Sequence, residues 1–485
     1  MRTALALVMT AALALATAAQ AATWEMTLRP AKEGAVFDVA EEPHIVATVR
    51  NIGGTAQTAT VTFDVTDFDG KALNSGAADT TVPKGESRAV DLTLGDAAKL
   101  PHEEALSLHV VLTADGAQQA EVHKTFGFLP ARPVTTPPES SPFGLLGEYA
   151  WPLLQRLGVR WVRPNWSWTE RPMEWAQRHG MAYCPLMNEA NAFVRGELSE
   201  AEYADFVKES VRRYKGYIHY WQLGNEFDIF HRDAPRAYVE SQRIGYAAAK
   251  SADPKCVVVN GSITELQVRK EGWRESLQLG LAKYCDVYDF HFYQDRKTTG
   301  DMLDYIHQTC RELKAEKPIW CTEFCQMPFE SNDDRNQARD ILRRFTYLLA
   351  NGVSVAMWHC YRWPYPYSAD KTAATGVVDY DGFARPSLFA YAAMTRELAG
   401  AKFKRSWPIG ENAFAIEFAR GDRSLLVIWS EKGTKKLRVH VAEGKASMTQ
   451  VSGRRVPLEV SGGIAALTAG DDPILCDLPT ISDIH

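Results

Sequence analysis

Two glutamates follow short apolar runs at distant places in the sequence. Glu226 comes after residues 218–222 and the turn residue Gly224. Glu323 comes directly after residues 318–322. We interpret both runs as buried strands, so each glutamate lies at the carboxyl end of its strand. A parallel barrel gathers such ends at one face, and a pair of carboxylates there can cleave a glycosidic bond.

The separation and the ionisation of two such carboxyl groups determine their chemistry. At about 5–5.5 Å, one carboxylate attacks the anomeric carbon while the other protonates the leaving oxygen, and the configuration is retained. The acid must hold a proton at the working pH, and a neighbouring ionised carboxylate favours this by raising its pKa. The nucleophile must stay ionised, which nearby cations and hydrogen-bond donors favour. The rest of the chain is expected to position the two glutamates and the groups that control their protons.

Eight predicted strands alternate with helical patterns in the middle of the chain. They are residues 143–147, 159–162, 182–187, 218–222, 257–261, 287–290, 318–322 and 353–358. A (β/α)8 TIM barrel fits this number of strands and this length of chain. The alternative, a doubly wound open sheet, predicts a Gly-rich phosphate-binding turn after the first strand, and residues 143–147 do not form one.

The segments on both sides of this region show the two-residue alternation of half-buried strands. Residues 22–130 and 401–485 contain short alternating runs separated by turn residues, so each is predicted to form a β-sandwich, the first of them Ig-like. Residues 131–141 are rich in Pro, Ser and Thr and are predicted to be a linker. We therefore predict a multidomain chain in which a catalytic barrel, residues 142–400, is flanked by an N-terminal and a C-terminal β-sandwich.

Residues 1–21 have the composition of an export signal. Arg2 precedes an apolar run at residues 4–16, and the small-x-small sequence at residues 19–21 is typical of a cleavage site. No later segment is long and apolar enough to predict a membrane span. We therefore expect an exported protein, periplasmic or secreted, that is cut near Ala21.

Charge, cysteine content and motif searches narrow the function classes. The formal net charge is −6, which gives no reason to expect a nucleic-acid partner. Seven of the eight cysteines fall in the predicted barrel, and we favour buried free thiols over a disulfide framework, with one or two bridges left open. The sequence has no His-Glu-x-x-His motif and no His/Cys cluster at zinc spacing, so we expect neither a metal nor an organic cofactor.

Several residues at predicted strand ends form a pattern along the chain. They are Arg163 after the second strand, Asn225 and Glu226 after the fourth, His291 and Tyr293 after the sixth, Glu323 after the seventh and Trp358 on the eighth. Together they resemble clan A of the glycoside hydrolases, the TIM-barrel retaining glycosidases. The Trp-x-x-Gly-Asn-Glu sequence that begins at Trp221 is most similar to the family 39-like group. The resemblance covers roughly residues 143–398, and the extra N-terminal sandwich departs from the family pattern and leaves the substrate open.

The resemblance implies a role for each of these residues. Glu226 would be the general acid/base, and Glu323 would be the nucleophile. Arg163 and Tyr293 would hold the charge of the nucleophile, and Asn225 would bind the 2-hydroxyl of the reacting sugar. A structural ion pair is the alternative for Arg163, and barrel packing is the alternative for Tyr293.

Five further residues are candidates for substrate contact. His291 would lie near the acid/base, with a core histidine as an equal alternative, and Trp358 would form the floor under the sugar, with packing as its alternative. Trp166 and Trp363 follow the second and eighth strands and are expected to be sugar platforms. Glu189 repeats the Asn-Glu dipeptide after the third strand, where it would contact substrate, or would be the acid if one strand has been miscounted.

The resulting expectation is an exported retaining glycoside hydrolase that cleaves β-linked O-glycosidic bonds in an oligo- or polysaccharide by double displacement. A non-catalytic carbohydrate-binding protein on the same scaffold is one alternative, but it has no need of both carboxylates. A transglycosylase is another, because it uses the same residues and differs only in the acceptor. The sugar, the linkage, exo or endo attack and the oligomeric state stay open.

Overall fold

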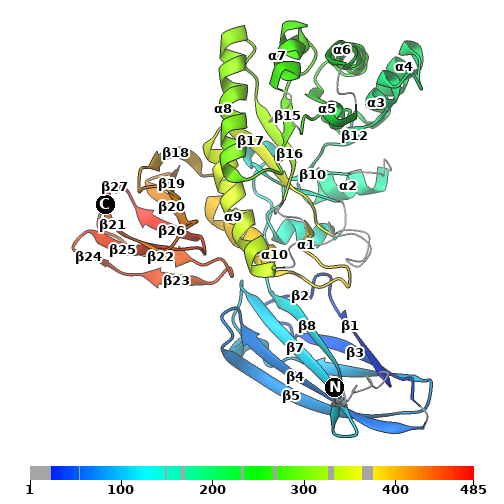
Figure 1. Ribbon diagram of the computed structural model, residues 1–485, viewed down its shortest axis with the longest axis vertical. Helices are drawn as coiled ribbons and strands as arrows, with labels where there is room; N and C mark the ends of the chain where they lie inside the picture. Colours follow the sequence, from blue (N-terminus) through cyan, green and yellow to red (C-terminus); the bar gives the residue numbers. More distant parts are fainter. Residues whose placement is uncertain are drawn as a thin grey trace, which may run out of the picture.

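The structure is a computed structural model that describes residues 23–485 except 54, 148–149, 165–169, 231–233, 265, 267–269, 326–332 and 363–374. The predicted export signal, residues 1–21, lies outside the described residues. The described chain forms a sandwich of strands, a central parallel sheet system covered by helices and a second group of strands (Figure 1). No helix in this part of the chain has both the length and the apolar composition needed to cross a membrane.

The N-terminal strands form two sheets around an apolar core. β1 (Trp24–Pro30), β3 (His44–Asn51) and β6 (Ser87–Thr93) make one sheet, and β2 (Val36–Phe37), β8 (Ala117–Phe128), β7 (Ala105–Ala114), β4 (Gln57–Asp67) and β5 (Ala72–Val82) make the other, in that order. Buried and more exposed residues alternate along β1, β4 and β7, as a strand with one covered face requires. Val61, Leu108 and Phe126 are among the side chains that fill the core.

Short parallel strands run through the centre of the molecule. They are β9 (Phe143–Leu146), β10 (Trp161–Arg163), β11 (Ala182–Tyr183), β12 (Leu186–Met187), β13 (Tyr220–Leu223), β14 (Val257–Asn260), β15 (Tyr288–His291), β16 (Ile319–Phe324) and β17 (Val353–Trp358). One sheet has the order β11-β10-β9-β17-β16-β15, and the other has the order β12-β13-β14. The sheets adjoin where β11 meets β12 and where parallel bridges join Val259 to Val287 and Ile263 to Phe290.

The third strand differs from the prediction for residues 182–187. The structure has two strands there, and the break falls at Cys184 and Pro185. A proline has no backbone N–H to donate to a ladder, so the strand is interrupted and changes its partner. β11 pairs with β10, whereas β12 pairs with β13. The other seven predicted strands are present, with ends that differ by up to two residues.

Helices follow these strands in the chain. They are α1 (Trp151–Arg156), α2 (Glu170–Arg178), α3 (Glu189–Val194), α4 (Glu200–Tyr214), α5 (Phe227–Phe230), α6 (Pro235–Ala252), α7 (Lys270–Gln278), α8 (Arg296–Leu313), α9 (Asp334–Ala350) and α10 (Pro386–Leu398). α4 begins with a capping box in which Ser199 and Glu202 bond each other's backbone N–H groups. Asp295 and Asp333 cap α8 and α9 through their side chains. α10 is buried almost throughout, because it packs against α9 and against strands of both flanking units.

The C-terminal strands form two further sheets, to the left of the centre in Figure 1. The first contains β18 (Lys402–Trp407), β19 (Ala413–Arg420), β20 (Arg423–Ser430), β26 (Ile474–Pro479), β22 (Ala446–Thr449) and β23 (Arg455–Leu458), and the second contains β24 (Val460–Ser461), β25 (Ile464–Ala469), β21 (Lys435–Val441) and β27 (Ile481–Ile484). Phe418, Leu425 and Trp429 belong to the central core, whereas Leu426 and Ile428 face a separate core of this unit. The first of these sheets therefore lies between the two cores.

The N-terminal sandwich and the central region each contribute a side chain to the apolar core of the other. Phe383, which precedes α10, is fully buried and belongs to the core of the sandwich. Val36 of β2 belongs instead to the central core. Backbone bridges join Gly34 to Phe383 and Thr125 to Ala384. The two units are therefore interlocked through their interiors.

The cysteines are structural in this fold. All eight lie in the described part of the chain, are buried and form no disulfide, so the interpretation as buried free thiols is confirmed. Burial raises the pKa of Cys184 and of Cys360 to about 12. Such thiols stay protonated near neutral pH and are poor nucleophiles.

Candidate active site

The fold brings Glu226 and Glu323 together. Glu226 follows β13, and Glu323 lies near the carboxyl end of β16. A carboxylate oxygen of each and Nδ1 of His291 all lie within 4.8 Å of one another. The two glutamate side chains are 16% and 12% exposed, so each keeps a small face open to solvent. Carboxylates this close can act on the two sides of one bond.

A tight turn in the backbone aims Glu226 at its partner. Gly224 has a φ of +89°, and Glu226 itself has a φ of +45°. A Cβ on Gly224 would lie 2.4 Å from the ring of Phe227, so only glycine fits there. A left-handed backbone at a residue other than glycine costs about 1–3 kcal/mol and is typical of functional sites. The hydroxyl of Ser262 supports this conformation, because its Oγ accepts a hydrogen bond from the backbone N–H of Glu226 at 3.1 Å.

A second asparagine holds Asn225. The backbone N–H of Asn225 donates to Oδ1 of Asn191 at 2.9 Å, and Nδ2 of Asn191 donates to the backbone carbonyl of Asn225 at 2.7 Å. Asn191 lies on α3 and is buried. Oδ1 of Asn225 accepts from Arg163 at 2.7 Å and from Ser262 at 3.1 Å. These bonds engage the amide oxygen of Asn225 and fix the orientation of its side chain.

Arg163 ties three of the parallel strands together at the site. It ends β10, and its side chain is fully buried. Nη1 donates to Oε1 of Glu323 at 2.5 Å, Nη2 donates to Asn225, and Nε donates to Oε1 of Gln222 at 2.6 Å. The planar fork of a guanidinium can meet three acceptors at once, which a lysine cannot do.

The surroundings of Glu323 keep its carboxyl group ionised. Burial acts to raise the pKa of Glu323, but the charges of His291 and Arg163, with that of His359 and the hydrogen bond from Tyr293, hold the pKa well below its usual range. The hydroxyl of Tyr293 donates to Oε2 of Glu323. Nδ1 of His291 lies 3.7 Å from the same oxygen. An ionised carboxylate of this kind suits a nucleophile.

His291 lies between the two glutamates and is fully buried at the end of β15. Nδ1 is 2.8 Å from Oε1 of Glu226, and Nε2 is 3.1 Å from the hydroxyl of Thr322. Burial acts to lower the pKa of His291, but the charge of Glu323 and hydrogen bonds with Asp289 and Glu226 raise the pKa to about 10. The imidazole is therefore protonated near neutral pH, and Nδ1–H donates to Glu226.

Three buried polar residues beneath the site were missed by the sequence analysis. Asp289 accepts from Nε2 of Gln222 at 2.6 Å, from the hydroxyl of Thr322 at 2.7 Å and from the backbone N–H of Thr322 at 2.9 Å. All three side chains are fully buried. Each lies inside an apolar strand, so a polar residue in a predicted core strand is the signal that could have found them. Through Gln222 and His291, this network connects Arg163 to Glu226.

The remaining predicted residues lie outside this cluster or outside the described residues. Trp358 is fully buried, donates from Nε1 to the carbonyl of Thr375 at 3.0 Å and packs edge-on against Phe324, which favours packing over a platform exposed to the sugar. Glu189 is the first residue of α3, and burial raises its pKa. Trp166 and Trp363 are not among the described residues.

The same cluster can be tested as a metal site. Glu226, His291 and Glu323 are close enough for their ligand atoms to share one ion. However, the guanidinium of Arg163 already meets Glu323 at 2.5 Å, and His291 carries a proton on the nitrogen that faces both glutamates. A metal ligand must be deprotonated, so this arrangement favours proton transfer over cation binding.

Solved structures share the fold of this chain. No protein-family model matches the sequence, and no curated protein is significantly similar to it. A family 39 glycoside hydrolase from the gut symbiont Bacteroides cellulosilyticus WH2 has a TM-score of 0.66, with 15% identity over 89% of this chain and 96% of that chain. A GH30 endoxylanase from Clostridium papyrosolvens C71 and a glucosidase from Croceicoccus marinus each have a TM-score of 0.51, with 12% identity over 70% of this chain and 96% of theirs.

Proposed function

We propose that the chain is a retaining glycoside hydrolase of clan A, nearest to the family 39-like group. The observation that carries the proposal is the pair Glu226 and Glu323, whose oxygens lie within 4.8 Å and of which only the second is bonded by Arg163 and Tyr293. One member of the pair is thus prepared for attack, and the other contacts a proton donor, His291. The fold shared with the family 39 and family 30 structures supports the proposal.

The proposed architecture explains why Glu226 and Glu323 lie at the same face of the central region. The two parallel sheets would be two arcs of one (β/α)8 barrel, residues 142–400, with sandwiches at residues 22–130 and 401–485. Strand order supports this. When the pairings within the two sheets are combined with the bridges between them, β9 to β17 are neighbours in the same order as in the sequence. Arg163, Asn225, His291 and Glu323 all lie at or near strand carboxyl ends. In TIM barrels this is the face that carries the active site.

In the first step of the proposed reaction, Glu323 attacks the anomeric carbon. The bond to the leaving oxygen breaks as Glu226 donates its proton to that oxygen, and a glycosyl ester forms on Glu323 with inverted configuration. Arg163 and Tyr293 keep Glu323 ionised until attack. Asn225 donates from its amide nitrogen to the 2-hydroxyl, an interaction that strengthens as charge develops.

In the second step, Glu226 removes a proton from water, and the water oxygen attacks the same carbon from the opposite face. The ester bond breaks, Glu323 leaves as a carboxylate, and two inversions give net retention. Formation of the ester removes the negative charge of Glu323, which is the largest of the effects that raise the pKa of His291. His291 therefore holds its proton less firmly in the intermediate, when Glu226 must act as a base.

We further propose an oligo- or polysaccharide with β-linked sugars as the substrate and export as the location. Two proteins with similar structures are an endoxylanase and a glucosidase, both of which act on sugars. The composition of residues 1–21 supports export to the periplasm or the medium. Glu189, Trp166 and Trp363 stay predicted substrate contacts.

Hydrolysis of a panel of aryl β-glycosides and polysaccharides tests the proposal. Wild type would be compared with Glu226→Gln, Glu323→Gln and the control Glu189→Gln, and proton NMR would follow the anomer released first. We expect retention, a loss of roughly 10²–10⁴-fold for Glu226→Gln and at least as large a loss for Glu323→Gln, because each removes a group used in the transition state. Inverted product, or an inactive Glu189→Gln beside an active Glu226→Gln, would overturn the assignment.

Azide rescue separates the two roles. With small anionic azide and a substrate that has a good leaving group, Glu226→Ala should give the β-glycosyl azide, because azide replaces water on the intermediate. Glu323→Ala should instead give the α-glycosyl azide, because azide replaces the nucleophile.

Two other results would support the alternative functions. Wild-type protein that binds glycans without cleaving any panel member would support the binding-protein alternative. Transfer of the sugar to an added sugar acceptor in preference to water would support the transglycosylase.

A further inference from the structure

Two neighbouring strands of the N-terminal sandwich place two histidines and a glutamate on one face. His109 lies on β7 directly opposite His123 on β8, and Val111 lies opposite Glu121. Residues two apart on a strand point to the same side, so Glu121 and His123 share a face. This face is the outer one, because His123 and Glu121 are exposed whereas Val122 between them packs on the sandwich core.

The three side chains bring their ligand atoms close together. The imidazole rings of His109 and His123 are stacked, with centroids 4.2 Å apart and planes 4° from parallel. Nε2 of His109 lies 3.6 Å from Oε2 of Glu121, and one ligand atom from each of the three residues lies within 4.8 Å of the others. Nε2 of His109 is shielded from solvent and has no hydrogen-bond partner in the described part of the chain. A shielded polar atom without a partner, beside a carboxylate, is a position that a ligand can satisfy.

We propose that His109, Glu121 and His123 bind one zinc ion on the outer face of the sandwich. Two imidazoles and a carboxylate, with a water as fourth ligand, are a donor set of zinc sites in proteins. Calcium and magnesium prefer oxygen ligands alone, so the two histidines select against them. Zinc lies about 2.0–2.2 Å from such ligands in a tetrahedral arrangement, so the stacked imidazole rings must rotate out of parallel and the three side chains must draw together by roughly 1 Å. Glu121 is 50% exposed and His109 is 34% exposed, which leaves room for that movement.

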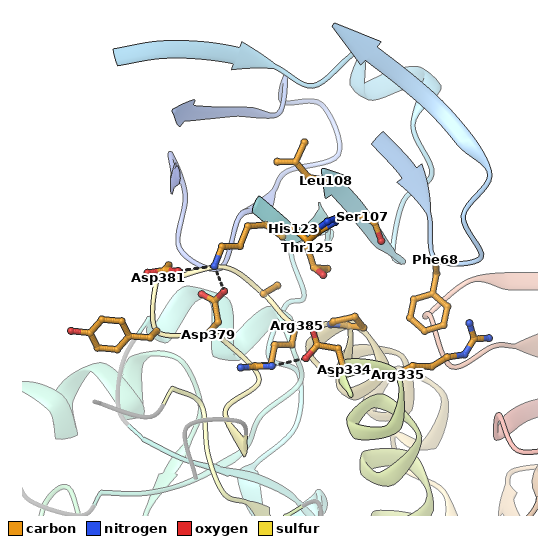
Figure 2. A pocket seen from close by; sticks show the side chains of 14 residues that line it. Phe68, Ser107, Leu108, His123, Thr125, Asp334, Arg335, Asp379, Asp381 and Arg385 are labelled. Atoms are coloured by element: carbon orange, nitrogen blue, oxygen red, sulfur yellow. Dashed lines mark hydrogen bonds and ion pairs between the residues drawn. The ribbon is translucent and has the colours of Figure 1, made fainter. Parts of the chain in front are cut away.

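The site adjoins the junction between the sandwich and the central region. His123 lines a cleft of 640 Å³ between the two units, and Figure 2 shows it on the sandwich side, across from Asp379 and Asp381. Lys124, the next residue, pairs with both of these aspartates at 2.7 Å. Thr125 forms a backbone bridge with Ala384. Zinc would therefore connect β7 to β8 just before β8 reaches the barrel.

Isothermal titration of zinc chloride into the full chain, first stripped with EDTA, tests the site at pH 7.5. We expect one ion per chain, and binding at least about tenfold weaker in His109→Ala and in His123→Ala, because each loses one of three protein ligands. His44→Ala is the matched control, since His44 is an exposed histidine on β3 of the same sandwich and should leave binding unchanged. Zinc should also raise the unfolding temperature of the wild type but not of the His109 variant.

Two results would overturn the proposal. One is the absence of saturable binding by the wild type, with circular dichroism showing a folded protein. The other is binding that both histidine variants keep and that Glu226→Gln or Glu323→Gln loses, which would place the ion at the candidate active site instead. Because the two sites use different residues, failure of the zinc site leaves the proposed hydrolase untouched.

Discussion

Replacement of Arg163 by methionine tests how Glu323 is held. The change removes a fully buried cation that donates to Glu323, Asn225 and Gln222 at 2.5–2.7 Å. Loss of one partner from a buried ion pair costs about 3–5 kcal/mol, because the other charge stays buried. For a domain of roughly 250 residues, 1 kcal/mol lowers the unfolding temperature by about 2–4 °C. We therefore expect the unfolding temperature of the central region to fall by roughly 6–20 °C.

A double-mutant cycle isolates the part that belongs to the ion pair. In a Glu323→Gln background the carboxylate charge is already absent, so Arg163→Met should cost less there, by about 1–3 kcal/mol. Differential scanning calorimetry can measure the unfolding temperature of all four proteins. Arg163→Lys keeps the charge but loses the fork, and it provides a milder variant if Arg163→Met does not fold.

An exposed ion pair in the same central region provides the control. Arg212 pairs with Glu209 on α4, and these side chains are 67% and 58% exposed. Arg212→Met should change stability by less than about 1 kcal/mol, since exposed ion pairs contribute little. If Arg163→Met cost no more than Arg212→Met, or if its effect were the same with and without Glu323→Gln, the account of Arg163 as the buried counter-ion of Glu323 would be refuted.

Three single substitutions test other contacts. Tyr293→Phe removes one hydrogen bond to Glu323, worth about 1.5–3 kcal/mol, so kcat/KM on the best substrate of the panel should fall roughly 10- to 100-fold, and a fall below threefold would contradict this. The pKa of His291 is raised from 6.5 to about 10 in the folded protein, so its charge stabilises the fold fully below pH 6.5 and ceases to do so as the pH rises through 10. The unfolding temperatures of wild type and His291→Gln should therefore differ more at pH 6 than at pH 10, and an equal difference would oppose the assignment. Lys124→Met removes the pairs with Asp379 and Asp381 and should destabilise the junction by about 1.5–3 kcal/mol in thermal unfolding, whereas an unchanged transition would show that the junction does not depend on these pairs.

The positions of the acidic pair and its cation could be predicted from the sequence because each follows an apolar run. Strand ends in a parallel sheet system converge on one face, so the order of Arg163, Glu226 and Glu323 along the chain was enough to place them near each other. The capping box at Ser199 was equally local, since it depends on two residues one helical turn apart. Each of these features needs only the pattern of one or two strands or helices.

The features that the sequence did not reveal depend on neighbours distant in the chain. Gln222, Asp289 and Thr322 come from three strands, and only their side-by-side register shows that one aspartate accepts from both of the others. The burial of Trp358 depends on Phe324 and on the carbonyl of Thr375, which are distant in the sequence, so the sequence favoured a sugar floor over packing.

The break in the third strand, by contrast, has a local cause. Pro185 lies between β11 and β12, so the sequence contained the signal for this break.

The position of Phe383 also affects the order in which the chain can fold. The sandwich is made first during synthesis, yet one of its fully buried core side chains lies beyond β17, just before α10. Until Phe383 has been translated, the core of the sandwich lacks one side chain and exposes apolar surface. Exposed apolar surface of this kind promotes aggregation or chaperone binding. The reverse holds for Val36 of β2, because the side chains that it packs against belong to the central core. The amino-terminal unit therefore completes its own interior only after the chain has been translated through β17 to Phe383, and a fragment that ends before Phe383 would lack this core side chain.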